Sequence, residues 1–204
     1  MPAERGEERP QIEREGDIHP GGDVSIVDAL DSRLPGPCRR RLLFLDVDGV
    51  LHPLKVRVLA GTQTVDTSHC FQESCMDQLR RVVRETGAEL VLTSSWRKFE
   101  KTRALLLEHL AQYDMTFREW TTTAGGESND ARVDQVLDFV TSSSAGSWAV
   151  VDDEDLAPST GSESMMRALF RQHFVRTDAS AGLDVTRADL LIELLCDHSG
   201  SDSP

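Results

Sequence analysis

The sequence predicts an α/β fold with a mostly parallel central sheet and helices on both of its faces. Three observations support this fold class. Short apolar runs alternate along the chain with amphipathic, helix-like patterns, which is typical of right-handed βαβ units. The central runs are apolar throughout, which indicates buried strands. Polar residues directly follow several of them, at the sheet edge where such folds bind ligands.

In the first half of the pattern, strands are expected over 41–46, 88–95 and 115–122, and helices over 74–87 and 98–114. The helix over 74–87 is expected because its apolar residues recur at helical spacing: Met76, Leu79, Val82 and Val83. Ser74 is its expected N-cap, and Gly87 is expected to end it.

In the second half, helices are expected over 129–143, 164–174 and 186–198, and strands over 147–153 and 174–178. The first of these helices begins with Asn129 or Asp130 as its cap, and the last is capped by Thr186. The strand over 174–178 is short and is expected at an edge of the sheet.

The two ends of the chain differ from this alternating region. Residues 1–37 contain no aromatic residue and five of the eight prolines, so the sequence predicts a disordered acidic, proline-rich tail there. A folded domain is expected over 38–196, and a second disordered tail over 197–204.

Composition excludes several classes of protein. The formal net charge of −13 leaves no broad basic surface for a polyanion. The four cysteines show no C-x-x-C spacing and indicate neither a zinc site nor a redox pair. The chain contains no apolar run long enough to cross a bilayer and no secretory signal pattern, so we expect no membrane partner and a cytoplasmic protein, with a nuclear location left open.

Polar side chains follow three of the buried strands. Asp46 and Asp48 follow the first, Thr93 and Ser94 the second, and Asp152 and Asp153 the third, in "VVDDEDL". If the strands are neighbours, these carboxylates meet at one edge and repel one another unless protons or a cation intervene. Such hard oxygen ligands suit Mg²⁺, and the hydroxyls and nearby backbone amides suit phosphate oxygens.

Each motif alone has a simpler interpretation. A D-x-D pair is often only a turn, "DDEDL" reads as an acidic helix start, and "TSS" reads as an N-cap. A calcium loop starting at Asp46 is excluded, because its twelfth position is Arg57 where a bidentate Glu is required. The combination of three polar strand ends in one domain favours a shared site.

These motifs resemble those of a known family. "LLFLDVDGVL" is similar to the first motif of the haloacid-dehalogenase (HAD) superfamily of phosphohydrolases, "ELVLTSS" to the second and "WAVVDDED" to the fourth. The combination of "VLTSSWR", "VVDD" and "GLDVTRADLL" more closely resembles the small HAD-like domains of multidomain Swiss Army Knife RNA-repair proteins. The resemblance covers about residues 40–196 and implies a Rossmann-like three-layer HAD fold.

The resemblance also implies roles for individual residues. Asp46 would be the nucleophile that forms an aspartyl-phosphate, and Asp48 the acid–base group. Thr93 and Ser94 would bind phosphate oxygens. A Mg²⁺ ion would be held by Asp46, the backbone carbonyl of Asp48, and Asp152 or Asp153.

The third motif of this superfamily requires a Lys or Arg, and Arg132 is the best positional match, with Arg97 and Lys98 as competitors. For Arg97, a surface salt bridge and a phosphate contact are both open interpretations. His52 is interpreted as an ordinary polar loop residue, and Trp96 and Trp148 as core residues.

Members of the superfamily often carry a cap domain, but the two insertion points here, around residues 53–72 and 121–130, are too short to fold independently. We therefore expect no folded cap domain and an open site. An open site fits a phosphate on a large substrate, such as a polynucleotide end or a phosphoprotein, or else requires a partner that excludes water.

Three functional hypotheses follow. The leading one is a Mg²⁺-dependent phosphomonoesterase with an open site that acts on phosphorylated substrates, nucleic-acid ends among them. The second is a phosphatase for small metabolites such as nucleotides. The third is a HAD-fold binding or scaffolding module without activity, against which the complete set of Asp46, Asp48, Thr93, Asp152 and Asp153 argues.

Overall fold

The structure is a computed structural model that describes residues 40–59, 62–66, 71–126, 128–157 and 165–196. Strands and helices alternate along these residues as predicted. The strands are β1 (Arg41–Leu45), β2 (Lys55–Leu59), β3 (Thr62–Asp66), β4 (Glu89–Leu92), β5 (Phe117–Trp120), β6 (Ser147–Asp152) and β7 (Phe174–Arg176). The helices are α2 (Glu73–Thr86), the 3₁₀ helix η1 (Ser95–Lys98), α3 (Glu100–Ala111), α4 (Asn129–Ser143), α5 (Met165–Gln172) and α6 (Val185–Cys196).

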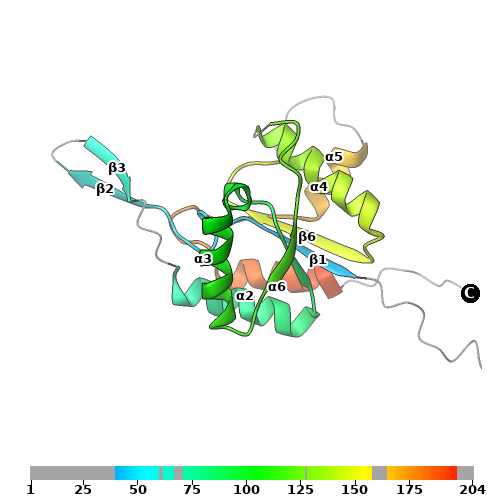
Figure 1. Ribbon diagram of the computed structural model, residues 1–204, viewed down its shortest axis with the longest axis horizontal. Helices are drawn as coiled ribbons and strands as arrows, with labels where there is room; N and C mark the ends of the chain where they lie inside the picture. The colour runs from blue at the N-terminus through cyan, green and yellow to red at the C-terminus, as the bar shows by residue number, and fades with distance from the viewer. Residues whose placement is uncertain (1–39, 60–61, 67–70, 127, 158–164, 197–204) are drawn as a thin grey trace, which may run out of the picture. The chain divides into compact units, whose positions relative to one another are not determined.

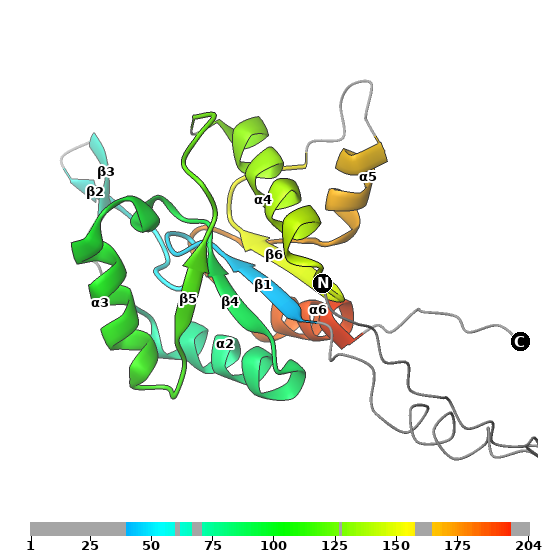
Figure 2. The same cartoon turned by 45° about the vertical axis from the view of Figure 1, so that its right-hand side comes forward.

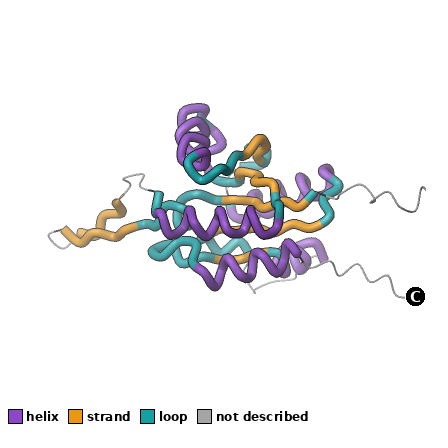
Figure 3. The backbone as a smooth tube through the Cα atoms, turned by 90° about the horizontal axis from the view of Figure 1, so that it is seen from below, coloured by secondary structure: helices purple, strands orange, loops and turns teal. Residues whose placement is uncertain are grey.

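Five strands form one parallel sheet in the order β5-β4-β1-β6-β7. Helices cover both of its faces, with α2, α3 and α6 on one side and α4 and α5 on the other (Figures 1 and 2). Seen along the layers, strands lie between helices (Figure 3). The predicted fold class is therefore confirmed, and β7 is an edge strand as expected.

The central strand β1 shows how the sequence creates two hydrophobic layers. Successive side chains of a strand point to opposite faces. Leu43 and Leu45 accordingly belong to the core that contains Leu79 of α2, Leu106 of α3 and Leu191 of α6. Leu42 and Phe44 belong to the opposite core, together with Val136 of α4, Phe170 of α5 and the predicted core residue Trp148.

The predicted helix starts were wrong by one or two residues. Gln72 rather than Ser74 precedes α2, without a capping hydrogen bond from its side chain. Ser128 caps α4 by accepting a hydrogen bond from the backbone N–H of Ala131. Asp184 caps α6 in the same way through the N–H of Arg187. In each case a neighbouring polar residue has the non-helical backbone that the cap position needs, whereas Gly87 ends α2 as expected.

The segment after the first motif contains an antiparallel hairpin, β2–β3, which the sequence analysis did not predict. Residues 60–61 and 67–70 of this segment lie outside the described part of the chain. The hairpin forms a separate two-stranded sheet, and the described residues include no folded cap domain, as expected.

Several predictions concern residues outside the described ranges. The two tails, 1–37 and 197–204, are among them, so the proposed domain boundaries remain predictions. In the part that is described, no helix is long and apolar enough to span a bilayer.

A single buried arginine, Arg97 of η1, joins three segments of the fold. Its guanidinium donates to the backbone carbonyls of Thr93 and Ser94 after β4 and of Thr121 and Thr122 after β5. It also donates to Oε1 of Gln135 in α4. Arg97 is 5% exposed, and burial lowers its pKa, to which the nearby charge of Arg132 adds. All five N–H groups find acceptors, so Arg97 makes neither the surface salt bridge nor the open phosphate contact considered above.

Replacing Arg97 with Met should destabilise the domain strongly. The substitution leaves several buried carbonyls without a donor, and each unpaired buried acceptor costs about 1–3 kcal/mol. We expect a loss of at least about 3 kcal/mol in the free energy of unfolding, measured by urea denaturation. Lys101→Met, on the exposed surface of α3, is the matched control and should change stability by less than about 0.5 kcal/mol. Equal stability of the two variants would contradict this role for Arg97.

Candidate active site

The polar residues after three neighbouring strands remain aligned at one edge of the sheet. The hydrogen bonds between neighbouring strands continue past the ends of β1 and β4. The N–H of Asp46 donates to the carbonyl of Val151 at 3.1 Å, and the N–H of Thr93 donates to the carbonyl of Leu45 at 2.9 Å. β1 lies between β4 and β6, so Asp46 is flanked on both sides by polar strand ends. This arrangement is the shared edge that the sequence predicted.

Three carboxylates gather at this edge. Side-chain oxygens of Asp46, Asp152 and Asp153 all lie within 4.8 Å of one another. Asp46 and Asp152 are buried, with 5% and 0% of their surfaces exposed, and Asp153 is partly buried. The carboxylate of Asp48 is not part of this cluster among the described residues.

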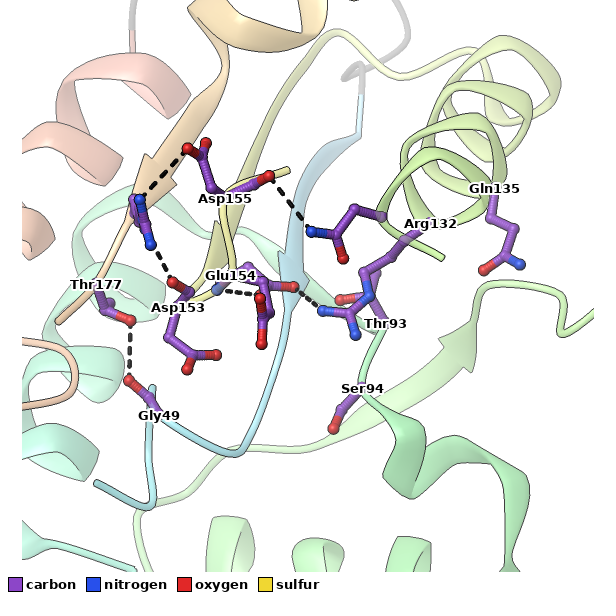
Figure 4. A network of polar contacts seen from close by, with 12 residues as sticks. Gly49, Thr93, Ser94, Arg132, Gln135, Asp153, Glu154, Asp155 and Thr177 are labelled. Carbon is purple, nitrogen blue, oxygen red and sulfur yellow. Dashed lines mark hydrogen bonds and ion pairs between the residues drawn. The ribbon is translucent and has the colours of Figure 1, made fainter. Parts of the chain in front are cut away.

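Arg132 supplies a positive charge to the cluster. It lies in the first turn of α4, and its Nη1 is 2.5 Å from Oδ2 of Asp152 (Figure 4). Burial opposes the charge of Arg132, but the nearby carboxylates, Asp152 first, raise its pKa above the ordinary value. Of the three candidates for the third-motif cation, Arg132 pairs with a carboxylate of the cluster, Arg97 is occupied by carbonyls, and Lys98 ends η1.

Crowding changes the acidity of the three carboxyl groups. Desolvation raises the pKa of Asp46 well above its usual value, and the charge of Asp152 adds to this, while Arg132 and a hydrogen bond from Ser94 oppose it. Desolvation likewise raises the pKa of Asp152 despite Arg132. Burial and the charge of Asp152 raise the pKa of Asp153 to about 6. One arginine therefore does not fully compensate three acids in this space.

Gly49 makes room for Asp153. Its backbone has φ +71°, a conformation that favours glycine, and a Cβ built there would lie 2.3 Å from Cγ of Asp153. The Thr177 hydroxyl donates to the Gly49 carbonyl at 2.8 Å and fixes the loop from the β7 side (Figure 4). The sequence analysis assigned no role to Gly49, although a glycine directly after D-x-D was a signal for a tight turn.

The two hydroxyl residues after β4 have different partners. The Ser94 hydroxyl accepts a hydrogen bond from the backbone N–H of Trp96, and its side chain counteracts part of the rise in the pKa of Asp46. Thr93 is fully buried, and its Oγ1 has no hydrogen-bond partner within the described residues. An unpaired buried hydroxyl is unfavourable, so Thr93 retains binding capacity for a further oxygen atom.

Asp48 has partners that the sequence analysis did not identify. Nδ1 of His52 lies 3.0 Å from Oδ1 of Asp48, and Nε1 of Trp96 donates to Oδ2 at 2.9 Å. His52 is buried, so its interpretation as an ordinary polar loop residue was wrong. Trp96 is a core residue as predicted, but its indole also has this polar contact.

The donor set fits a hard divalent cation. An octahedral Mg²⁺ with bonds of about 2.1 Å places opposite ligands about 4.2 Å apart, close to the 4.8 Å limit for the three carboxylates. Asp152 accepts one hydrogen bond on each oxygen, from Glu154 N–H and from Arg132, and a carboxylate oxygen has a second lone pair. Asp152 therefore has capacity for a metal ion in addition to these two hydrogen bonds.

Comparison with known proteins agrees with this geometry. The family model described as the HAD domain in Swiss Army Knife RNA repair proteins matches residues 42–188, a range that begins in β1 and ends in α6. No curated protein and no solved structure matches the chain. The parallel sheet, the acidic edge and this match over well over half of its length identify the chain as a member of the family of HAD domains in Swiss Army Knife RNA repair proteins.

Proposed function

We propose that the protein is a Mg²⁺-dependent phosphomonoesterase that works through an aspartyl-phosphate on Asp46. The observation that carries this proposal is the cluster of Asp46, Asp152 and Asp153 beside Arg132. A buried site rich in carboxylates and only partly neutralised suits a cation together with an anionic substrate. Family membership supports hydrolase chemistry of the HAD type.

The proposed reaction has two displacements at phosphorus. In the first, a carboxylate oxygen of Asp46 attacks phosphorus, the bond to the leaving oxygen breaks, and Asp48 gives that oxygen a proton. In the second, Asp48 takes a proton from a water molecule that attacks the phosphorus of the aspartyl-phosphate. The Asp46–phosphorus bond then breaks and inorganic phosphate is released.

The remaining residues would hold the phosphoryl group. Thr93 Oγ1, unpaired and buried, would donate to one phosphoryl oxygen, and Arg132 would lie close enough to balance the added negative charge. Asp46, Asp152 and Asp153, with the backbone carbonyl of Asp48, would hold Mg²⁺, which when bound would neutralise charge on the transferring group.

We further propose that the substrate is the phosphorylated end of a polynucleotide. Beside Asp153 lies a hollow of about 490 Å³ whose lining includes Arg176 and Arg187. Arg176 donates to the backbone carbonyl of Asp153 and pairs with Asp155. Arg187 donates to the backbone carbonyl of Arg176 and pairs with Asp184. The guanidinium N–H groups beyond these contacts would suit a neighbouring phosphodiester. Four other cations lie near the motifs in sequence. Arg97 is buried, Lys98 ends η1, and the side chains of Lys55 and Arg57 lie outside the described residues.

Asp46→Asn should abolish turnover and leave the fold intact, because the amide keeps the shape of the carboxylate but is a poor nucleophile. The measurement is phosphate release from p-nitrophenyl phosphate and from 5′- and 3′-phosphorylated oligonucleotides with Mg²⁺, alongside a melting curve. Asp138→Asn, at an exposed position of α4, is the control and should retain full activity. Wild-type activity in Asp46→Asn would rule out the covalent mechanism.

Mg²⁺ should stabilise the protein more as the pH rises from about 4 to 7. The pKa of Asp153 is raised from 3.8 to about 6 in the folded state, so the folded protein binds a proton on this carboxyl group more tightly than the unfolded chain does. The contribution of Asp153 to the free energy of unfolding is therefore fully present below pH 3.8 and is lost as the pH rises through 6. Bound Mg²⁺ offsets the repulsion once the groups are ionised. The difference between the melting temperatures measured with Mg²⁺ and with chelator should therefore grow as the pH rises. The growth should be smaller for Asp153→Asn than for the wild type. A pH-independent difference would argue against this cluster as the metal site.

Arg187→Gln should reduce kcat/KM for a phosphorylated oligonucleotide by about 10-fold or more, as the loss of one hydrogen bond to a charged group implies. It should leave kcat/KM for the matching mononucleotide unchanged. The wild-type preference for the oligonucleotide should shrink as salt rises. Arg118→Gln, on the exposed face of β5, is the matched control. A salt-independent preference for mononucleotides would favour a metabolite phosphatase instead.

A further inference from the structure

We propose that Trp96 and His52 are positioning residues that hold the carboxylate of Asp48 toward the leaving group. The inference rests on the proposed phosphatase function, in which Asp48 is the acid–base group. It goes beyond that function because it assigns roles to two residues outside the four sequence motifs. The observation behind it is that each oxygen of Asp48 contacts a different buried side chain.

Asp48 needs such support because it is less enclosed than the proposed nucleophile. Its side chain is 38% exposed, whereas Asp46 is 5% exposed. An acid–base group must lie within hydrogen-bond reach of the oxygen it protonates. An aspartate at this exposure has open space for other side-chain rotamers, so contacts to both oxygens restrict it to one.

The indole of Trp96 is a rigid donor. Its ring belongs to the hydrophobic core beneath α2, α3 and α6. It packs edge-to-face on Phe71, with ring centroids 5.6 Å apart. Its backbone N–H donates to Ser94, and its carbonyl accepts from Thr102 at 2.6 Å. Because both ring and backbone are fixed, the indole N–H has a fixed direction toward Oδ2 of Asp48.

His52 reaches Asp48 through the tight turn that follows β1. The carbonyl of Val47 accepts hydrogen bonds from three successive amides, those of Val50, Leu51 and His52. The N–H of Gly49 donates to the carbonyl of His52 at 2.9 Å. The turn brings the buried imidazole beside Oδ1 of Asp48. The two partners thus come from the ends of β1 and β4 and connect the first motif to the second.

A simpler role for these contacts is also testable. A buried indole N–H needs an acceptor, and in this simpler role Asp48 supplies it with no effect on the reaction. Removing the contact would then lower stability without slowing the first displacement for one substrate more than for another. If the contact positions Asp48, the slowing of the first displacement depends on how much the leaving oxygen needs a proton.

Trp96→Phe removes the N–H and keeps an aromatic ring. The experiment compares the single-turnover rate of aspartyl-phosphate formation from p-nitrophenyl phosphate, whose phenolate leaves without assistance, and from a nucleoside 5′-phosphate, whose alkoxide needs a proton. We expect this rate to fall about 10-fold for the nucleotide, as for the loss of one hydrogen bond to a charged group, and to stay within about 3-fold of wild type for p-nitrophenyl phosphate. Breakdown of the aspartyl-phosphate, which also uses Asp48, should slow by the same factor for both substrates. Trp120→Phe, at an exposed tryptophan, is the matched control.

His52 gives an independent test should Trp96→Phe fold poorly. His52→Asn retains a side-chain N–H near the position of Nδ1 and should preserve activity, whereas His52→Leu should show the same leaving-group dependence as Trp96→Phe. In the metal-free protein, the NMR signal of the Trp96 indole N–H should shift, and its hydrogen exchange should accelerate, in Asp48→Ala but not in Asp138→Asn. This readout does not depend on turnover.

Equal losses in the rate of aspartyl-phosphate formation for both substrates, or no loss, would overturn the positioning role while leaving the proposed function intact. An unchanged indole signal in Asp48→Ala would overturn it as well. If the wild-type protein showed no Asp46-dependent turnover, the proposed function and this inference would both fall.

Discussion

The repulsion among Asp46, Asp152 and Asp153 is the constraint on which the rest of the site depends. Three carboxylates have oxygens within 4.8 Å of one another, and Arg132 forms an ion pair with one of them, Asp152. The pKa of each carboxyl group is raised mainly by desolvation. Interiors tolerate such groups only with protons, a cation or a compensating network. The fold therefore concentrates unfavourable charge at the edge where α/β sheets bind ligands.

The surrounding structure keeps this arrangement from relaxing. Gly49 allows the loop after β1 to approach Asp153, and the Thr177 hydroxyl fixes this loop by donating to the carbonyl of Gly49. Arg97 holds the loops after β4 and β5 against Gln135 of α4, the helix whose first turn contains Arg132. The contacts of Arg97 are carbonyl oxygens and not carboxylates, so they do not neutralise its positive charge. This charge lies near Asp46.

The fold was predictable from the sequence because its strands are short apolar runs and its helices are amphipathic. The polar ends of β1, β4 and β6 were identified for the same reason, since parallel strands end at one edge. Helix caps were missed because several adjacent residues could fill each cap position, as with Ser74 and Gln72. The contact of Trp96 with Asp48 joins residues far apart in sequence, and no local pattern reports it. The five acceptors of Arg97 are likewise a tertiary property, and a lone arginine after a strand gives no sign of them.

The central claim is that Asp46 attacks phosphorus, and mass spectrometry of the protein quenched in acid during turnover tests it most directly. In the presence of Mg²⁺ and substrate, the peptide containing Asp46 should gain the mass of one phosphoryl group. With p-nitrophenyl phosphate, whose leaving group needs no proton, the modified fraction should be larger in Asp48→Asn, since breakdown of the intermediate still needs Asp48. Turnover with no phosphoryl group on Asp46 in either protein, or with the group on another residue, would contradict the account.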